Sequence, residues 1–198
     1  MMSIKAKSNI VLSKKGPEDA KKYWLEKLSA QFCGTSLPFD FIRPQEYEKA
    51  ECKISFDRSI KDKLLEVAGD SELALYILLL SVYKVLLFKY TGQEDITVAS
   101  PVFGVDCKTN RVIPVRDSVE DKISFGELIN RVAKTVTDAY ENQYYPIADI
   151  IEILGIADNK NSFANTVLIF ENIHEKKLCS EEEAVQSVFV SFRRKGKE

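Results

Sequence analysis

The only histidine in this sequence is the first residue whose type could support acid–base chemistry near neutral pH. His174 lies in the stretch ENIHEKK, directly after a predicted strand. An imidazole can act as a general base because its ordinary pKa is about 6.5. No nucleophile and no orienting acid stand at a fixed spacing from it in the sequence. We therefore interpret His174 as a solvated loop residue rather than as a catalytic base.

Other catalytic and metal-binding signatures are absent from the 198 residues. The sequence contains no G-x-S-x-G, no P-loop and no G-x-G-x-x-G, and we assign no catalytic residue. The four cysteines are scattered and form no C-x-x-C pair, so we expect no metal site. No signal-peptide pattern is present, and we expect reduced, buried thiols in a cytoplasmic protein rather than disulfides; the cysteines are Cys33, Cys52, Cys107 and Cys179.

A cluster of polar and aromatic residues, Asn142 to Pro146, separates two apolar patterns. The first pattern has helical spacing and Pro146 can begin a second helix, so the cluster predicts a corner between two helices. Asn142 and Gln143 can satisfy carbonyls left free at the end of the first helix. Tyr144 and Tyr145 could stack on a ligand, but such a pair more often buries its rings and leaves its hydroxyls in water. We favour the structural role for this corner.

The elements around this corner indicate a mixed α/β protein with helices packed on a sheet. Helices are expected from residues 17, 59, 73, 125 and 147, with a capping box formed by Ser124 and Glu127. Strands are expected at 51–56, 95–103, 111–116, 163–172 and 185–192, with Pro114 pushing its strand towards an edge or a bulge. The predicted core positions are Trp24, Leu79, Leu86, Val132 and Val136, and the expected inward positions of the second helix are Ile60, Leu64, Leu65 and Ala68.

Composition favours one globular domain, and we expect residues 1–15 to be a flexible segment ahead of the folded residues 16–198. The chain is 45% hydrophobic and 29% charged, with a net charge of −2. This balance disfavours nucleic-acid binding, and we interpret the basic residues 193–197 as a solvated terminus. The most apolar run, Leu73 to Leu80, is too short to span a bilayer, so we expect no membrane contact.

Five stretches, in order along the chain, strongly resemble the condensation domain of nonribosomal peptide synthetases. The closest match is KYTGQEDITVASPV, from Lys89, where that family commonly carries Tyr/Thr-Gly-Gln-Glu-Asp-Ile-Val-Val-Gly-x-Pro-Val. The stretch NQYYPI, from Asn142, is similar to the family's HQDYPFE motif and keeps its Gln, a Tyr and its Pro. The five stretches, between about residues 20 and 172, are YWLEKLS, LPFDFIRP, LLLSVYKVLLFKYTGQEDITVASPVFG, ISFGELINRVAKTVTDAYENQYYPIADII and FANTVLIFEN.

The resemblance implies a single lobe of a chloramphenicol acetyltransferase-like (CoA-dependent acyltransferase-like) fold. Two such lobes form the family's domain, and the amino-terminal lobe supplies a His-His-x-x-x-Asp-Gly motif for amide formation between two carrier-bound acyl groups. Both substrates arrive on phosphopantetheine arms through a tunnel between the lobes, so no cofactor is expected to bind this chain directly. The chain has no adjacent histidines. We therefore expect it to begin near the crossover between lobes, to lack the histidine-bearing lobe and to end before the usual final strands.

Two family segments are altered, and the candidate site follows from the resemblance alone. The family's Asn-Thr-Leu-Pro-Leu-Arg segment appears as RVIPVR, and its Arg-Asp-x-Ser motif as DNKNSF. The expected tunnel-side or interface residues are Val98, Phe103, Arg116, Asn142, Gln143, Tyr144 and Tyr145.

Three functions are compatible with this resemblance. The leading hypothesis is a partial condensation domain that is not catalytic alone and serves as a half-site or interaction module in peptide natural-product biosynthesis. The second is a split acyl or peptidyl transferase that a histidine-bearing lobe completes in trans. The third is a docking scaffold for carrier or adenylation domains. A homodimer through the face left open in a single lobe is a further expectation.

Overall fold

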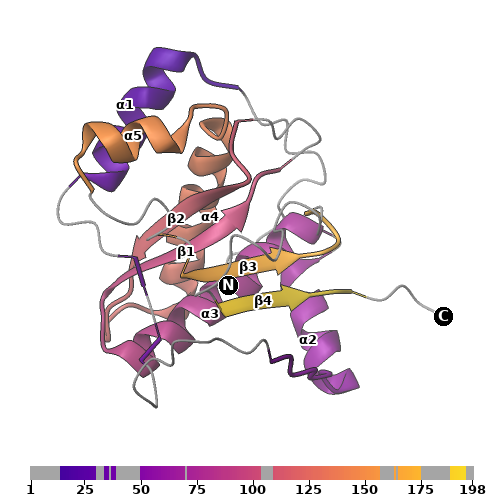
Figure 1. The fold of residues 1–198 in the computed structure, drawn as a ribbon. Coiled ribbons are helices and arrows are strands. Elements are labelled where there is room, and N and C mark those ends of the chain that lie inside the picture. The colour runs from indigo at the N-terminus through magenta and orange to yellow at the C-terminus, as the bar shows by residue number, and fades with distance from the viewer. Residues whose placement is uncertain are drawn as a thin grey trace.

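The computed structural model describes residues 14–29, 34–35, 37–38, 50–69, 71–103, 109–156, 163, 165–174 and 188–194. Within these residues, helices pack on a four-stranded sheet with the strand order β2-β1-β3-β4 (Figure 1). In chain order the elements are α1 (Pro17–Leu28), α2 (Arg58–Ala68), α3 (Glu72–Thr91), β1 (Asp95–Pro101), β2 (Val112–Ser118), α4 (Phe125–Glu141), α5 (Ile147–Ile153), β3 (Thr166–Phe170) and β4 (Val188–Phe192). This architecture confirms the expected mixed α/β fold.

The sheet combines one antiparallel pair of strands with two parallel pairs. β1 and β2 pair antiparallel with Ala99 opposite Pro114, whereas β1 pairs with β3, and β3 with β4, in parallel. Pro114 has no N–H to donate, and β2 is an edge strand, which confirms the expected effect of this proline. β3 is buried along its whole length, in agreement with the apolar run that predicted a central strand.

Helix α3 is the central helix of the core. Its first turn is capped by the Ser71 side chain, which accepts a hydrogen bond of 3.2 Å from the Ala74 amide. It ends at Gly92, whose φ of +68° is the left-handed conformation that glycine adopts readily. Among the described helices, α3 alone is long and apolar enough to cross a membrane, but 67% of its most apolar window is buried inside the protein. This burial is typical of a core helix.

A buried ion pair joins α3 to both strands of the antiparallel pair. The Lys84 ammonium lies 3.1 Å from Asp117 Oδ2 and donates to the carbonyls of Val115, at 2.7 Å, and Ile96, at 3.2 Å. The Thr135 hydroxyl of α4 donates to Asp117 Oδ1 at 2.5 Å. Burial lowers the pKa of Lys84, and the Asp117 charge opposes this shift. One charge pair therefore ties α3, β1, β2 and α4 together.

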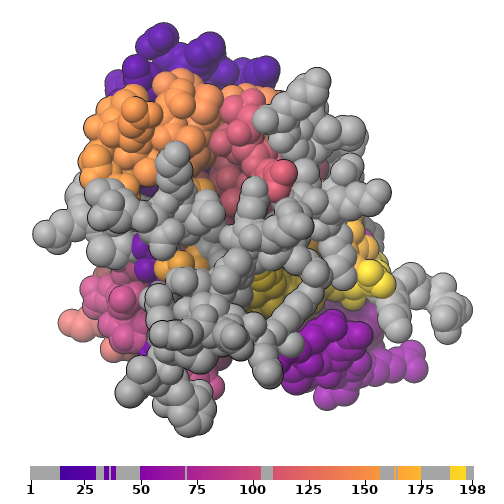
Figure 2. All heavy atoms as spheres, in the orientation of Figure 1, coloured from indigo at the N-terminus to yellow at the C-terminus, as the bar shows by residue number. Residues whose placement is uncertain are grey.

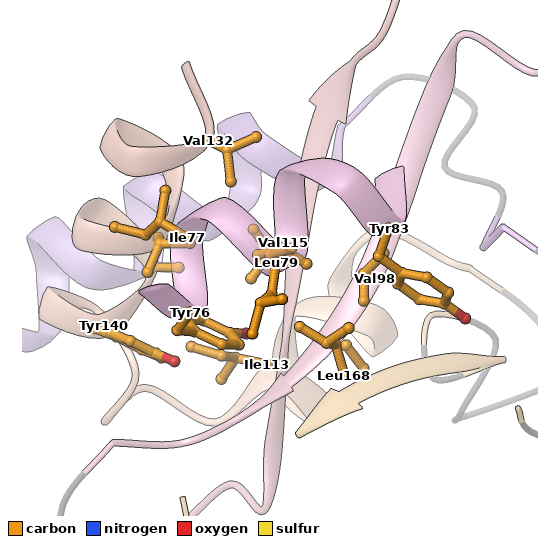
Figure 3. Packing of buried hydrophobic residues seen from close by; sticks show 14 of the residues in the cluster. Tyr76, Ile77, Leu79, Tyr83, Val98, Ile113, Val115, Val132, Tyr140 and Leu168 are labelled. Atoms are coloured by element: carbon orange, nitrogen blue, oxygen red, sulfur yellow. The ribbon is translucent and has the colours of Figure 1, made fainter. Parts of the chain in front are cut away.

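The expected capping box starts α4. The Ser124 side chain accepts from the Glu127 amide, and the Glu127 carboxylate accepts from the Ser124 amide at 3.0 Å. Figure 3 shows Val132 of this helix in the same core as Leu79, Val98 and Val115. Trp24, Leu79, Val132 and Val136 are all buried, which confirms four of the five predicted core positions.

Helices α1 and α5 pack against each other at one end of the molecule, where Figure 2 shows them as adjoining indigo and orange surfaces. The fully buried Trp24 fixes α1 in place, because its indole Nε1–H donates to the Asn142 carbonyl at 2.9 Å. Ahead of α1, the Lys15 amide donates to the Glu141 carbonyl at 3.2 Å. The corner at the end of α4 thus also anchors the first helix.

Three expectations about secondary structure and packing are wrong. Residues 51–57 form no strand and are exposed, with Ile54 85% accessible, because no other described strand pairs with them. Leu86 lies on the outer side of α3 and is 49% exposed. Ile60, expected to point inward, is exposed near the start of its helix, while Leu64 and Leu65 are half-buried and Ala68 is buried.

Two expectations about polar and sulfur-containing side chains also need correction. Cys52 is exposed, not buried, since it lies in the segment that does not join the sheet. Arg194 is half-buried and pairs with Glu72 at 3.0 Å, and Arg193 pairs with Glu171, so these two residues are not a free solvated terminus. Cys33, Cys107 and Cys179, residues 39–44, residues 159–162 and residues 195–198 lie outside the described part of the chain.

Candidate functional site

The candidate site is built around the amide side chain of Gln143. Gln143 Oε1 accepts from the Phe103 amide at 2.7 Å, and Gln143 Nε2 donates to the Phe103 carbonyl at 3.0 Å. This two-bond contact copies the pairing of a β-bridge and holds the chain just after β1 against the corner between α4 and α5. Gln143 was expected to satisfy carbonyls of its own helix, but its side chain instead bonds another segment.

Asn110 completes this contact from the segment before β2. Its Nδ2 donates to the carbonyls of Gln143, at 2.7 Å, and Tyr145, at 2.6 Å, and its Oδ1 accepts from the Ile147 amide at 3.0 Å. The Ile147 amide is at the first position of α5, so Asn110 also caps that helix. Asn110 was not among the expected site residues. Its only sequence signal is an Asn shortly before a predicted strand, which is common in turns.

Asn142 is the residue of the corner that behaves as the sequence predicts. Its Nδ2 donates to the Asp138 carbonyl at 2.7 Å, which satisfies a free carbonyl at the end of α4. Its own carbonyl accepts from the Trp24 indole. Asn142 is buried, so its role is to hold the helix end rather than to contact a substrate.

The two tyrosines of the corner differ in exposure. Tyr144 is exposed, and the Lys14 ammonium lies 4.3 Å from the centre of its ring, within the range of a cation–π contact. Tyr145 is half-buried and packs against the core. Together with Phe103, which is also half-buried, these rings give the corner an aromatic surface.

Val98 and Arg116 lie apart from this corner. Val98 is completely buried between the sheet and α3, so it does not line a surface. Arg116 lies in β2, and its guanidinium binds both carboxylate oxygens of Asp95 at the start of β1, the end away from the corner, with the shortest contact at 2.6 Å. The expected set therefore divides into Phe103 and the corner residues, which the structure brings together, and these two residues, which it does not.

His174 is not a solvated loop residue, and that interpretation is wrong. The turn after β3 folds the chain back, so His174 is buried, with only 4% of the residue exposed. Its Nδ1 accepts from the Phe170 amide at 3.1 Å, and its Nε2 lies 2.8 Å from the Tyr140 hydroxyl. The Tyr140 hydroxyl lies 2.9 Å from Ser100 Oγ, which also accepts from the Tyr76 hydroxyl at 2.7 Å.

Burial sets the charge states along this chain of hydrogen bonds. It lowers the pKa of His174 to about 4 and raises the pKa of Tyr76 to about 12, while the pKa of Tyr140 is well above its ordinary value. At neutral pH the imidazole is therefore uncharged, and both of its nitrogens are engaged. A general base needs a free lone pair directed at its substrate, so His174 does not fit that role. Within the described residues, no group of three His, Cys, Asp or Glu side chains could hold a metal ion.

Comparison with known proteins places this fold in a family. A family model described as "Condensation domain" matches residues 4–195. Tyrocidine synthase 3 of Brevibacillus parabrevis is 32% identical over 167 residues, which cover 78% of this chain and 3% of that protein. Surfactin synthase subunit 1 of Bacillus subtilis (strain 168) is 34% identical over 157 residues, which cover 73% of this chain and 4% of that protein. This chain thus spans only a small part of the length of these relatives.

Solved structures show the same fold. The X-domain from teicoplanin biosynthesis superposes with a TM-score of 0.62 at 20% identity, over 79% of this chain and 37% of that one. The starter condensation domain of rhizomide synthetase, in a "product-released" conformation, gives a TM-score of 0.61 at 16% identity, over 78% of this chain and 36% of that one. These likenesses confirm the chloramphenicol acetyltransferase-like fold expected from the resemblance. Since the family match extends over nearly the whole sequence, this chain belongs to the condensation-domain family of nonribosomal peptide synthetases.

Proposed function

We propose that this chain serves as the carboxyl-terminal lobe of a condensation domain and does not form amide bonds alone. One observation carries the proposal: the single histidine among the 198 residues is buried, uncharged and hydrogen-bonded at both ring nitrogens. The family's chemistry, as the resemblance implies it, uses a pair of histidines from the other lobe. This lobe then contributes one wall of the tunnel, and the reacting amine and thioester meet the histidine from the facing wall.

The partners follow from this role. The acyl donor and acceptor reach the tunnel on phosphopantetheine arms of carrier domains, and adenylation domains load those carriers in the cytoplasm. A histidine-bearing lobe, in the same protein or in a second one, faces the aromatic surface formed by Phe103, Tyr144 and Tyr145. Residues 16–198 act as one lobe.

The test uses the purified 198-residue chain with two carriers, one loaded with a donor acyl group and one with an acceptor aminoacyl group. We expect no dipeptidyl product from the chain alone, measured by mass spectrometry of the carriers. Adding the histidine-bearing lobe of a related condensation domain is expected to give product. Product from the chain without that lobe would refute the proposal, and the same reaction with His174→Gln would show whether the imidazole is responsible.

A matched pair of variants tests the aromatic surface. Tyr144→Ala removes an exposed ring at the corner, whereas Tyr90→Ala removes an exposed ring near the end of α3, away from the corner. We expect only Tyr144→Ala to weaken binding to the added lobe in sedimentation velocity experiments. Equal binding by the two variants would exclude the corner as the contact surface.

The docking role is the second candidate, and one comparison favours it. The X-domain from teicoplanin biosynthesis, in its complex with OxyB, superposes on this chain with a TM-score of 0.61 at 19% identity. A lobe of this fold can thus belong to a domain that binds a second protein. Light scattering of the chain with isolated carrier or adenylation domains distinguishes this role, and a concentration series of the chain alone reports whether it forms the homodimer expected for an unpaired lobe.

A further inference from the structure

The hydrogen bonds around His174 have only one consistent arrangement of protons. The Phe170 N–H can only donate, so His174 Nδ1 must carry its lone pair, and the neutral ring must hold its proton on Nε2. The Nε2–H then donates to the Tyr140 oxygen, and the Tyr140 hydroxyl donates to Ser100 Oγ. The Tyr76 hydroxyl also donates to Ser100 Oγ, whose own proton goes to the Pro101 carbonyl at 3.0 Å.

This arrangement connects the carboxyl ends of two parallel strands to the helix layer. Ser100 lies near the end of β1, Phe170 is the last residue of β3, and Tyr76 and Tyr140 come from α3 and α4. Figure 3 shows Tyr76 and Tyr140 next to each other at one end of the core. The Tyr140 ring also stacks on Phe103 with centroids 5.6 Å apart, so the same hydrogen bonds support the corner bound by Gln143.

A second proton on the imidazole is incompatible with this arrangement. Protonated histidine carries N–H groups on both nitrogens, so Nδ1–H would face the Phe170 N–H, and two donors cannot bond each other. From the described elements packed around the ring, the titratable groups that face it are Tyr76 of α3 and Tyr140 of α4. Both are neutral near pH 7. Glu72, one turn before Tyr76 in α3, pairs with Arg194 through its Oε1. No carboxylate of the described residues contributes to the pKa of His174, which burial alone shifts.

We propose that His174 is a protonation-controlled lock, which holds the carboxyl ends of β1 and β3 against α3 and α4 only as the neutral Nε2–H tautomer. At low pH the imidazole is protonated only when it is released from these hydrogen bonds, so acid favours the released state. In that state the carboxyl ends of β1 and β3 separate from α3 and α4, and the Phe103–Gln143 corner loses its support. Burial also favours the neutral imidazole, since desolvation lowers the pKa of His174. The lock affects the shape of the corner and is independent of whether the lobe needs a histidine-bearing partner.

The single histidine makes a direct measurement possible. In the full chain labelled with ¹⁵N at histidine, long-range ¹H–¹⁵N spectra contain one imidazole, so its tautomer and its titration are read without assignment. We expect the Nε2–H tautomer at pH 7.5 and a midpoint well below the ordinary value of about 6.5. An Nδ1–H tautomer, or a midpoint at or above that value, would overturn the proposal.

Hydrogen exchange at the Phe170 amide tests the opening itself. If the opened state binds the extra proton with a pKa of about 6.5 and the closed state with a pKa of about 4, the protection factor of this amide falls by about 80-fold between pH 6.5 and pH 4. His174→Gln keeps a donor towards Tyr140 but does not titrate, so its protection is expected to be lower at neutral pH and to lack this fall. His174→Asn keeps an acceptor for the Phe170 amide and should behave in the same way.

Controls separate the lock from general acid sensitivity. Tyr90→Phe changes an exposed ring near the end of α3 that takes no part in these hydrogen bonds, and it should keep the pH dependence of the unmodified protein. A protection factor at Phe170 that does not vary between pH 7 and pH 4.5, or that falls equally in His174→Gln, would refute the lock. If His174→Gln does not fold, the tautomer and the midpoint in the unmodified chain still decide the question.

Discussion

The buried Lys84–Asp117 ion pair allows us to predict how much free energy of unfolding is lost when one of its charges is removed. The two side chains are 0% and 1% exposed, and the ammonium has three oxygen partners. Changing Lys84→Met keeps the length of the side chain but leaves the Asp117 carboxylate buried without its cation. Removing one partner of a buried pair costs about 3–5 kcal/mol, since the remaining charge is uncompensated. We expect Lys84→Met and Asp117→Leu each to lower the free energy of unfolding by about this amount.

The double variant separates the attraction between the two charges from the free-energy cost of burying each charge. Lys84→Met with Asp117→Leu removes both charges, and replacing a whole buried pair with apolar groups is often close to neutral. The loss in the double variant should therefore fall short of the sum of the two single losses by at least about 2 kcal/mol. Urea unfolding, followed by circular dichroism and by the fluorescence of the single tryptophan, gives all four free energies.

An exposed ion pair that involves another lysine of α3 provides the control. Lys89 lies 3.0 Å from Asp121, almost the same distance, but these side chains are 64% and 77% exposed. Exposed pairs contribute about 0–1 kcal/mol, so Lys89→Met should change the free energy of unfolding by no more than that. Equal losses for Lys84→Met and Lys89→Met, or additive losses in the double variant, would refute the reasoning that the Lys84 pair is a single buried unit.

Three further predictions concern stability and can be checked by the same unfolding experiments. Leu79→Ala should cost about 2–5 kcal/mol because Leu79 is buried, whereas Leu86→Ala, at an exposed position of the same helix, should cost less than about 1 kcal/mol. Ser124→Ala should cost about 1 kcal/mol, since it removes the cap of α4, and a loss near zero would contradict the capping box. Gly92→Ala should cost about 1 kcal/mol from backbone strain alone, since no atom lies within 4 Å of an added Cβ while φ is +68°.

Most helices and strands could be predicted because their signals are local. Pro17 starts α1, Ser124 and Glu127 form the box that starts α4, and Gly92 ends α3; each acts on backbone groups within a few residues. The alternating stretch 51–56 shows the limit of this reasoning. Alternation describes the two faces of a possible strand, but a strand also needs a hydrogen-bonding partner, and that partner is not encoded nearby.

Burial was harder to predict where the sequence is apolar on every side. Helix α3 carries leucines all around its axis, so nothing in the pattern distinguishes the buried Leu79 from the exposed Leu86. Of the candidate site, the corner and the role of Asn142 could be predicted from the helix end. The contacts of Gln143 with Phe103 and of His174 with Tyr140 join residues 40 and 34 positions apart, and only the tertiary fold brings them together.

The order of the strands in the sheet has a consequence for how this lobe folds. α3, β1, β2 and α4 follow one another between Glu72 and Glu141, so their mutual contacts lie within one continuous segment of the chain. β3 joins β1 only after α4 and α5, and α1 docks on a corner far along the chain, so both require the closure of long loops. We expect the segment from Glu72 to Glu141 to form the folding nucleus, with β3, β4 and α1 adding later; pulse-labelled hydrogen exchange during refolding should show protection of β1 and β2 amides before that of β3.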